Sequence, residues 1–547
     1  MNVATRKIYT YTGTATGNLG GVALTAAAQA FAKANTNITP AKLGLTGVEA
    51  TTAEKDKLID YVYGYDSYDR NSNGNTTEKR SWILGDIIHS VPLIVNYDGT
   101  GTNSLIIVGA NDGMLHAFDD ATGAEQWAFV PPDILANLNN LRPGESGTHP
   151  FFVDSSPKMK IVTAGSQKIL VFGLGRGGRA YYALDITSKT APTLLWRVNN
   201  AVSGFAELGQ TWSTPALSRA ANGGSPVDVA VFGGGYDPYF DTPDTSAANP
   251  SSPMGRTVYM VNLITGALIA SGGVQTHAIP SDPLLFDVNG DGIFDRGYVG
   301  DMGGKLWRLS DSFTMTKLFS TPNGQRIFYQ PDAVINNGSV MVYFGTGDRS
   351  SPMSTYFTDR FYAVRDDGTN NLQESDLVNV TSRVVQPGST QYDDLLEEIG
   401  DDHGWFLVLG GSGEKVLSPP TVYFNIAFST FIPSTAVCQA GGTARVYVVD
   451  PLVGGPTTDL ANTTGGGLGG GTSTGGGFGS GASGALIAAD RFVSVGQSIP
   501  TSLKVTFGDN ETKAFFGVTK GGGIALQPLL LPQIASNVIP VSWRQGW

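Results

Sequence analysis

The segment DVNGDGIFD, residues 287–295, places oxygen-bearing side chains at alternate positions. Asp287, Asn289, Asp291 and Asp295 occupy its odd positions, and Gly292 follows the third of them. Alternate residues of a tight loop direct their side-chain oxygens toward one point, and the glycine permits a sharp turn. The segment therefore follows the calcium-loop pattern D-x-[DN]-x-[DN]-G.

Three carboxylates and other hard oxygen donors favour Ca²⁺ over zinc, which prefers His and Cys ligands. The expected ligands are the side chains of Asp287, Asn289, Asp291 and Asp295 and the backbone carbonyl of Ile293. A helix–loop–helix site would end in Glu at its twelfth position, where this chain has Tyr298, and the flanks are typical of strands. We predict a calcium loop between two strands. The alternative is a turn that its own Asp and Asn side chains stabilise.

A second segment, DRNSNGNTT at residues 69–77, has the same skeleton with Asp69, Asn71, Asn73 and Gly74. It has only one carboxylate, so its affinity for a cation should be poor. A solvent-exposed loop is the favoured interpretation, with a second ion as the alternative.

Signatures of enzymes are scarce. The motif GLGRGG (173–178) imitates a phosphate-binding loop, but a strand follows it where a helix is required. Cys438 has no base near it in the sequence, so a buried or idle thiol is favoured. None of the histidines has metal-ligand spacing; they are His89, His116, His149, His277 and His403. We predict no catalytic residues, no bound organic cofactor and no enzymatic activity.

The composition narrows the class of protein. The net charge of −12 argues against a nucleic-acid surface, which needs a basic face. The single cysteine excludes an intrachain disulfide and fits either a cytosolic protein or a large exported β-protein. No apolar run is long enough for a membrane span, and the first residues lack the apolar core of a signal peptide. Seventy-two glycines and low charge suggest short strands and tight turns.

A repeat begins near residue 81. Each unit has an apolar β run ending in Gly, a turn, and a second β run. The units lie at 105–130, 169–187, 229–237 with 255–270, 296–311, 340–348 with 359–368, 421–431 with 444–455, and 513–528. Such units cannot bury both faces of a small sheet alone, so they stack around an axis. The repeat predicts an all-β fold, a seven-bladed β-propeller, with six or eight blades and a sandwich or solenoid as alternatives.

A short Ser/Thr/Pro element precedes each unit. These elements lie at 89–92, 154–157, 212–215, 279–283, 329–331, 417–420 and 498–502. Proline at the start of an innermost strand costs little, because the missing N–H would not be needed there.

Two domains are expected, an N-terminal segment 1–80, partly helical or extended, and a propeller, 81–547. Thr51 and Glu54 have capping-box spacing at the start of a helix in 51–66, and the Ala-rich stretch 21–35 is a further helical candidate. Residues 463–484 are nearly all Gly, Ser and Thr and should form a flexible insertion. A second, acidic insertion at 392–409 is expected to be partly helical.

Several motifs together resemble the PilC/PilY family, tip-associated biogenesis and adhesion proteins of bacterial type IV pili. They are WILGDIIHSVPLIV (82–95), VGANDGMLHAFDDATGAEQWAFVP (108–131), the loop 287–295, residues 404–433 and the closing VSWRQGW. The resemblance implies a quinoprotein-like C-terminal propeller and Ca²⁺ at Asp287, Asn289, Asp291, Ile293 and Asp295 that regulates pilus extension against retraction. It implies a position at the pilus tip and cell surface, associated with the outer membrane, and roles in surface attachment and twitching motility. Minor pilins are the implied partners, and host-cell or abiotic surfaces the implied targets.

Two other classes share the expected fold. A quinone-dependent dehydrogenase would stack its cofactor on a disulfide between adjacent cysteines, which one cysteine cannot supply. A plain propeller scaffold would use the metal for stability alone. Family members usually carry a large N-terminal region and an export signal, neither of which is visible here, so we expect a fragment or a homologue with a different N-terminal partner.

Overall fold

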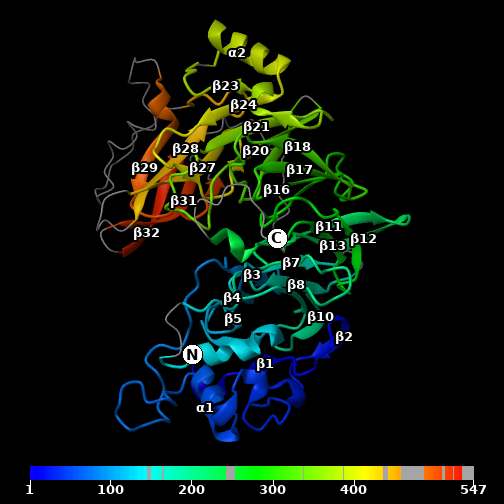
Figure 1. Cartoon of the computed structure of the whole chain (residues 1–547), viewed down its shortest axis with the longest axis vertical. Coiled ribbons are helices and arrows are strands. Elements are labelled where there is room, and N and C mark those ends of the chain that lie inside the picture. The colour runs from blue at the N-terminus through cyan, green and yellow to red at the C-terminus, as the bar shows by residue number, and fades with distance from the viewer. Residues whose placement is uncertain are drawn as a thin grey trace.

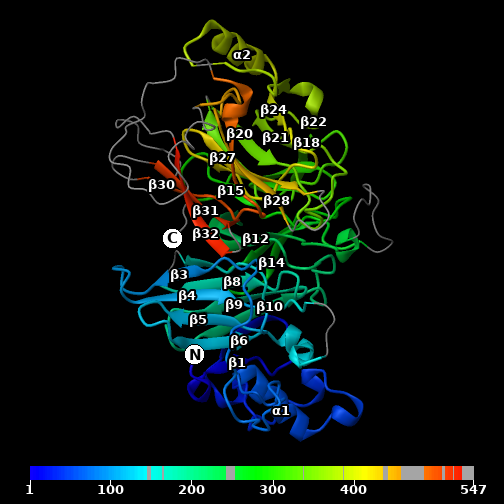
Figure 2. The ribbon, with the colours of Figure 1, turned by 90° about the vertical axis from the view of Figure 1, so that its left-hand side faces the viewer.

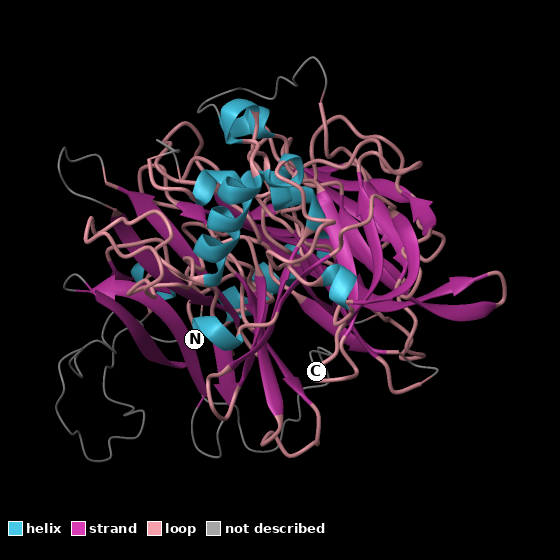
Figure 3. Cartoon of the chain, turned by 90° about the horizontal axis from the view of Figure 1, so that it is seen from below, coloured by secondary structure: helices cyan, strands magenta, loops and turns pink. Residues whose placement is uncertain are grey.

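Seven mainly antiparallel β-sheets follow one another along the described residues of the chain in the computed structural model (Figure 1). The structure describes residues 1–144, 149–162, 165–241, 253–336, 338–385, 387–434, 441–457, 486–507, 512–520 and 523–531. Strands dominate the described residues (Figure 3). The seven predicted repeat units coincide with the seven sheets, as the prediction of seven blades requires.

The first three sheets contain the following strands in spatial order. Sheet 1 holds β1 (Ile8–Thr10), β6 (Glu125–Val130), β5 (Leu115–Asp119), β4 (Ser104–Gly109) and β3 (Leu93–Asn96). Sheet 2 holds β2 (Gly17–Ala23), β10 (Thr193–Asn199), β9 (Ala180–Asp185), β8 (Lys168–Gly173) and β7 (Lys158–Ile161). Sheet 3 holds β11 (Ala216–Asn222), β12 (Ser225–Gly233), β13 (Val258–Asn262) and β14 (Leu268–Ser271). Figure 2 shows the strands of sheet 1 side by side.

The remaining sheets follow the same plan. Sheet 4 holds β15 (Leu284–Phe286), β16 (Arg296–Gly300), β17 (Lys305–Ser310), β18 (Met315–Ser320) and β22 (Leu372–Gln373). Sheet 5 holds β19 (Asp332–Asn336), β20 (Ser339–Gly345), β21 (Arg360–Asp366), β24 (Gly404–Val408) and β23 (Val378–Asn379). Sheet 6 holds β25 (Lys415–Val416), β27 (Ile426–Pro433), β28 (Gly442–Val449) and β29 (Phe492–Gly496), with β26 (Thr421–Val422) also on β27. Sheet 7 holds β30 (Lys504–Phe507), β31 (Thr512–Lys520) and β32 (Gly523–Leu531).

Helices are few in the described chain. Two α-helices are present, α1 (Thr52–Tyr63) and α2 (Thr390–Asp401). The 3₁₀ turns are η1 (Val3–Thr5), η2 (Ala27–Gln29), η3 (Ala41–Leu43), η4 (Gly47–Glu49), η5 (Pro132–Leu141), η6 (Pro238–Asp241), η7 (Glu374–Asp376) and η9 (Ala488–Arg491). Within these described residues no helix is both long and apolar enough to cross a membrane.

Two of the three predicted helical regions, 51–66 and 392–409, are confirmed. Thr51 caps α1, accepting a hydrogen bond on its side chain from the Glu54 N–H. Helix α2 lies in the acidic insertion at 392–409. The Ala-rich stretch 21–35 is not a helix, because its first residues complete β2 and pair with β10. The Gly-rich insertion 463–484 and Cys438 lie outside the described residues.

The Ser/Thr/Pro elements lead into the first strand of their sheets, as β3 follows residues 89–92 and β11 follows 212–215, except that element 417–420 lies between β25 and β26. Where the strand begins, a serine hydroxyl supplies a ladder acceptor. The Ser90 hydroxyl accepts from the Gly109 N–H at 2.9 Å, and the Ser213 hydroxyl accepts from the Gly233 N–H at 2.9 Å. The element therefore replaces hydrogen bonds that a proline-containing strand cannot complete.

Glycines at strand ends allow neighbouring sheets to approach closely. A Cβ on Gly109 would lie 2.3 Å from the Val153 carbonyl oxygen, and one on Gly233 would lie 2.2 Å from the Ile279 carbonyl oxygen. Val153 directly precedes the element that opens sheet 2, and Ile279 begins the element that opens sheet 4. The repeated glycine is thus required by contact between blades.

Tryptophans at the outer strands join successive sheets. The indole N–H of Trp127 donates to the Lys189 carbonyl of sheet 2, and that of Trp196 donates to the Leu263 carbonyl of sheet 3. Trp405 makes the same contact with Pro451 of sheet 6. These three are fully buried, as expected for packing between blades. Trp82, which precedes the first blade, is 75% exposed and does not pack between blades.

The N-terminal segment 1–80 shares two of the propeller sheets. Strand β1 pairs in parallel with β6, and β2 pairs antiparallel with β10. Its apolar residues Ile8, Leu24 and Leu58 are buried in the same core cluster as sheets 1 and 2. This segment therefore folds against the first two blades (Figure 2).

Candidate metal site

The predicted calcium loop connects β15 and β16, the two innermost strands of sheet 4. Phe286 and Arg296 are paired at its base, and the Asp295 N–H closes it by donating to the Phe286 carbonyl at 3.0 Å. The expectation of a loop between two strands, without flanking helices, is confirmed.

Asp287 organises the first half of the loop. Its Oδ1 accepts from the Gly290 N–H at 2.7 Å and its Oδ2 accepts from the Gly292 N–H at 2.7 Å. Both glycines have a φ of 81°, a conformation that other residues rarely adopt. The two glycines therefore turn the backbone so that its N–H groups face one carboxylate.

Asp295 organises the second half. Its Oδ2 accepts from the Val288 N–H at 2.7 Å and the Asn289 N–H at 3.2 Å. Its Oδ1 accepts from the Asn289 side-chain amide at 3.1 Å. The first and last carboxylates of the segment thus face the same short stretch of backbone.

The remaining predicted ligands make local turns. The Asn289 Oδ1 accepts from the Asp291 N–H at 2.9 Å, and the Asp291 Oδ1 accepts from the Ile293 N–H at 2.8 Å. Asn289 and Asp291 are exposed, while Ile293 is half-buried. These contacts are Asx turns, in which a side-chain oxygen satisfies the backbone two residues later.

Phe294 anchors the loop to the neighbouring blade. Its side chain is 1% exposed and packs with Val229 and Val231 of sheet 3. Its N–H donates to the Arg219 carbonyl of β11 at 3.0 Å. The loop is therefore exposed at its tip and fixed at its base between sheets 3 and 4.

The five predicted ligands thus share one loop, but their carboxylates do not converge. Across the part of the chain that the structure describes, no group of three or more His, Cys, Asp or Glu side chains is arranged to hold a metal ion. The donor chemistry nevertheless fits a hard cation, because every carboxylate oxygen of the loop except Asp295 Oδ2, which accepts from two N–H groups, has a lone pair left for a metal. For the carboxylates to converge on one ion, exposed side chains such as that of Asp291 have to rotate. Calcium at this loop remains a prediction.

Loop 69–77 uses the same design. The Asp69 carboxylate accepts from the Asn73 and Gly74 N–H groups at 2.9 and 3.1 Å. The Glu78 Oε1 accepts from the amides of Asn71 and Asn73 at 2.6 and 2.8 Å. Glu78 lies just beyond the predicted segment and takes the place that Asp295 has in the other loop.

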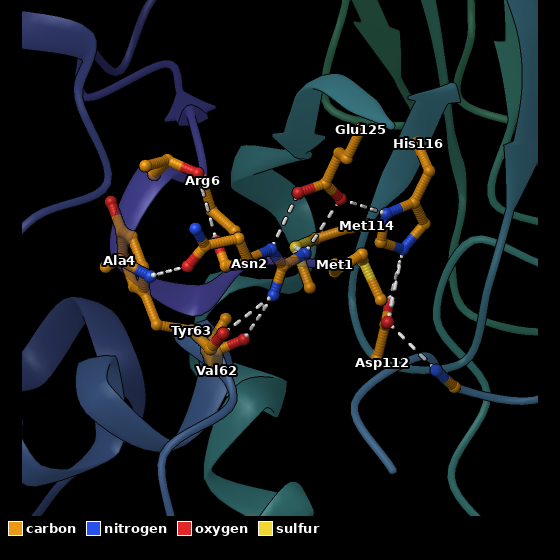
Figure 4. Close-up of polar contacts among 12 residues, drawn as sticks. Met1, Asn2, Ala4, Arg6, Val62, Tyr63, Asp112, Met114, His116 and Glu125 are labelled. Carbon is orange, nitrogen blue, oxygen red and sulfur yellow. Dashed lines mark hydrogen bonds and ion pairs between the residues drawn. The ribbon is translucent and has the colours of Figure 1, made fainter. Parts of the chain in front are cut away.

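A buried ionic network, which the sequence did not indicate, joins the N-terminal segment to sheet 1 (Figure 4). Arg6 forms a two-point contact with Glu125, with its Nε 2.7 Å from Oε2 and its Nη2 2.9 Å from Oε1. The His116 Nδ1 lies 2.8 Å from Glu125 Oε1, and its Nε2 lies 3.0 Å from Asp112 Oδ1. Arg6 also donates to the Val62 carbonyl at 3.0 Å, at the end of α1.

Burial and two carboxylates act in opposite directions on His116. Burial lowers its pKa, but the contacts with Asp112 and Glu125 outweigh it and raise the pKa to about 9. For Glu125, burial raises the pKa, but His116 and Arg6 lower it to about 2. The network therefore holds two cations and two carboxylates, and its geometry is that of a structural clamp.

A second buried charge cluster lies between sheets 5 and 6. A cavity of about 10 Å³, room for about one water molecule, is lined by Arg326, Asp348, Ser354, Phe357, Asp359 and Lys415. Burial raises the pKa of Asp359 to about 6 and lowers that of Lys415. The Lys415 ammonium donates to three backbone carbonyls, including that of Ser354 at 2.7 Å. These contacts tie the 348–358 loop to sheet 6.

Comparison with known proteins places the loop within a defined domain. Residues 95–351 match the family model described as the PilY1 β-propeller domain, and loop 287–295 lies inside this range. These residues form a PilY1-family β-propeller domain. The resemblance to the PilC/PilY family is thereby confirmed for this domain.

Relatives support the assignment. The chain is 30% identical over 512 residues to a type IV pilus biogenesis factor PilY1 homolog of Xylella fastidiosa, covering 83% of this chain and 40% of that protein. It is 31% identical over 281 residues to type IV pilus biogenesis factor PilY1 of Pseudomonas aeruginosa, covering 46% of this chain and 22% of that protein. The chain spans well under half the length of these curated relatives.

A solved structure supports the fold. The crystal structure of the Pseudomonas aeruginosa PilY1 C-terminal domain matches with a TM-score of 0.54 and 21% identity, covering 78% of this chain and 93% of that one. At this identity the match supports the propeller fold of the matched part of this chain.

Proposed function

We propose that the chain is the propeller part of a type IV pilus biogenesis factor that works at the pilus tip and cell surface. The observation that carries the proposal is the PilY1 domain match at residues 95–351, supported by relatives named as pilus biogenesis factors. In this role the propeller supports pilus extension, surface attachment and twitching motility without catalysing a reaction. Minor pilins of the tip are its proposed partners, and host-cell or abiotic surfaces its targets.

We further propose that loop 287–295 binds Ca²⁺ through the side chains of Asp287, Asn289, Asp291 and Asp295 and the carbonyl of Ile293. Three carboxylates within nine residues repel one another unless a cation is present. Binding would draw the exposed tip together over a base that Phe294 fixes between two sheets. A partner protein that contacts the exposed tip of loop 287–295 would then bind differently with and without the metal.

Asp291→Ala tests the site. Asp291 is exposed and contacts only its own loop, so the variant should fold like the wild type. Isothermal titration should show that calcium binding is lost, while circular dichroism is unchanged. Unchanged affinity in the variant would refute the assignment. Micromolar affinity in the wild type would favour a sensor, and nanomolar affinity a permanent support.

Genetic complementation tests the role in the pilus. A strain lacking the corresponding gene should regain surface pili and twitching with the wild-type chain restored in its natural context, and the Asp291→Ala variant should restore them only in part. Full twitching in the absence of the gene would contradict the proposed function. An absorbance spectrum of the purified protein separates this role from that of a quinone enzyme, which would show a cofactor band.

A further inference from the structure

Four of the seven sheets carry an extra strand on the outer edge, supplied by another segment of the chain. Strand β1 covers β6, β2 covers β10, β22 covers β18 and β23 covers β24. Three of these additions are parallel and one is antiparallel. The outer edge of this propeller therefore accepts an added strand in either direction.

Strand β14 is the outer edge of sheet 3, and within the described residues no strand covers it. The Gly272 N–H donates to the Val258 carbonyl at 2.9 Å, so Gly272 faces β13. Because N–H groups alternate along an antiparallel strand, the N–H and C=O of Ser271 face outward. Ser271 is exposed. Unpaired groups of this kind can pair with another chain.

This edge lacks the features that usually protect a strand from pairing. No Asp, Glu, Lys or Arg and no proline occurs from Thr257 to Thr276. Three apolar side chains along it are exposed, Ile264 at 38%, Leu268 at 36% and Val274 at 57%. Proteins commonly guard open edges with lysine, proline or inward charges. The segment that forms the edge of sheet 3 therefore carries no charge or proline of its own that would hinder pairing.

The other uncovered outer edges in the described residues are different. Strand β29 of sheet 6 directly follows Asp490 and Arg491, and β32 of sheet 7 contains Pro528. A charge pair or a proline hinders the approach of a further strand. Of the three uncovered outer strands β14, β29 and β32, only β14 is flanked by neither a charged residue nor a proline.

We propose that β14 is a docking edge for an extended, uncharged segment of a partner protein, which adds to sheet 3 as its fifth strand. Main-chain hydrogen bonds to Ser271 and its neighbours hold the segment, and contacts with Ile264, Leu268 and Val274 select its side chains. A second copy of this chain is disfavoured as the occupant, because two molecules of net charge −12 repel each other. The proposal does not depend on calcium at loop 287–295.

A strand-forming peptide provides the test. The probe is an acetylated Thr–Val repeat with a lysine at each end and a fluorophore on one lysine, and its binding is followed by fluorescence anisotropy. Hydrogen exchange in the wild-type protein should slow in the segment that contains Ser271 when the peptide is added. Leu268→Lys should weaken binding at least tenfold, because it places a desolvated charge beside the added strand.

Matched variants control for general effects of charge and stability. Ile161→Lys adds the same charge at an apolar site of similar exposure, 48%, on β7 of sheet 2, and should bind the peptide like the wild type. Ser271→Pro removes the outward N–H and should also lose binding. Equal binding by Leu268→Lys and the wild type, or no slowing of exchange at Ser271, would overturn the proposal. Self-association of the wild type that Leu268→Lys abolishes would overturn the choice of partner.

Discussion

Loops 287–295 and 69–77 share the spacing of their first six residues but differ in charge and support. In both, one Asp at the start accepts from glycine N–H groups, and a carboxylate at the end accepts from asparagine amides. Loop 287–295 adds a third carboxylate, Asp291, where loop 69–77 has Asn73. Asx turns hold this spacing in both loops, and we propose that the number of carboxylates decides which of them binds a cation.

The two loops also differ in what fixes their bases. Phe294 is buried between sheets 3 and 4, so loop 287–295 rises from a rigid base. In loop 69–77 two residues other than glycine, Asp69 and Ser72, have φ values of 51° and 56°. The Asp66 N–H closes the base of this loop by donating to the Glu78 carbonyl at 2.8 Å, but no residue of 69–77 is buried. Loop 287–295 is therefore the better organised of the two for a ligand.

Among the changes that compare the two loops, Asp287→Ala should have the largest effect. This change removes the acceptor for two backbone N–H groups and one of the three carboxylates. Loss of hydrogen bonds to a charged group costs about 1.5–3 kcal/mol each, so calcium affinity should fall at least about a hundredfold. Isothermal titration measures it. The matched change Asp69→Ala in the other loop should leave calcium binding unaltered, and an equal loss there would reverse the ranking of the loops.

A pH titration of stability tests the buried ionic network of Arg6, Asp112, His116 and Glu125. The pKa of His116 is raised from 6.5 to about 9, so its stabilisation is fully present below pH 6.5 and is lost as the pH rises through 9. The free energy of unfolding should fall by roughly 1–3 kcal/mol over this window. Denaturant unfolding with and without calcium measures it. In the variant His116→Gln the free energy of unfolding should vary less with pH over this window. The same pH dependence in the variant and the wild type would show that His116 is not protonated in the folded protein.

Asp291→Asn gives loop 287–295 the residue pattern of loop 69–77. It keeps the size of the side chain and its oxygen for the Ile293 N–H, but removes one negative charge. Calcium affinity should fall about tenfold, equivalent to about 1.4 kcal/mol, with no change in the fold. Titration calorimetry beside the wild type gives the ratio. Equal affinities would mean that charge count does not separate the loops.

The reverse exchange, Asn73→Asp, has the smallest expected effect. It gives loop 69–77 a second carboxylate within the segment, beside that of Asp69, with Glu78 next to them. Weak calcium binding, in the millimolar range, should appear as a second site in the titration. The change also removes the Asn73 amide bond to Glu78, so no gain in stability is expected without calcium. Tight binding at this loop would show that the base of the loop is irrelevant.

The sequence predicted the blades well because their signal is local. Five of the seven units end an apolar strand with a glycine, and contact with the next blade requires that glycine, as at Gly109 against Val153. The added strands were not predicted, since β2 contains three glycines and becomes a strand only through pairing with β10. Strands β22 and β23 have two residues each, too few to give a pattern.

The candidate site was predicted in part for the same reason. All five proposed ligands lie in one loop because nine consecutive residues cannot separate far. The direction of each side chain was not predictable, because backbone N–H groups compete for the carboxylates. The His116 network was missed since Asp112, Glu125 and Arg6 meet across separate elements, and a register shift between Ala117 and Phe118 hides the pairing of β5 with β6.

A calcium titration of the wild-type protein beside Asp291→Ala, in one buffer and at one ionic strength, tests the central claim most directly. One saturable site in the wild type and none in the variant, with identical circular dichroism spectra, is the predicted result. The absence of a saturable site in the wild type, or the same affinity in both proteins, would contradict it.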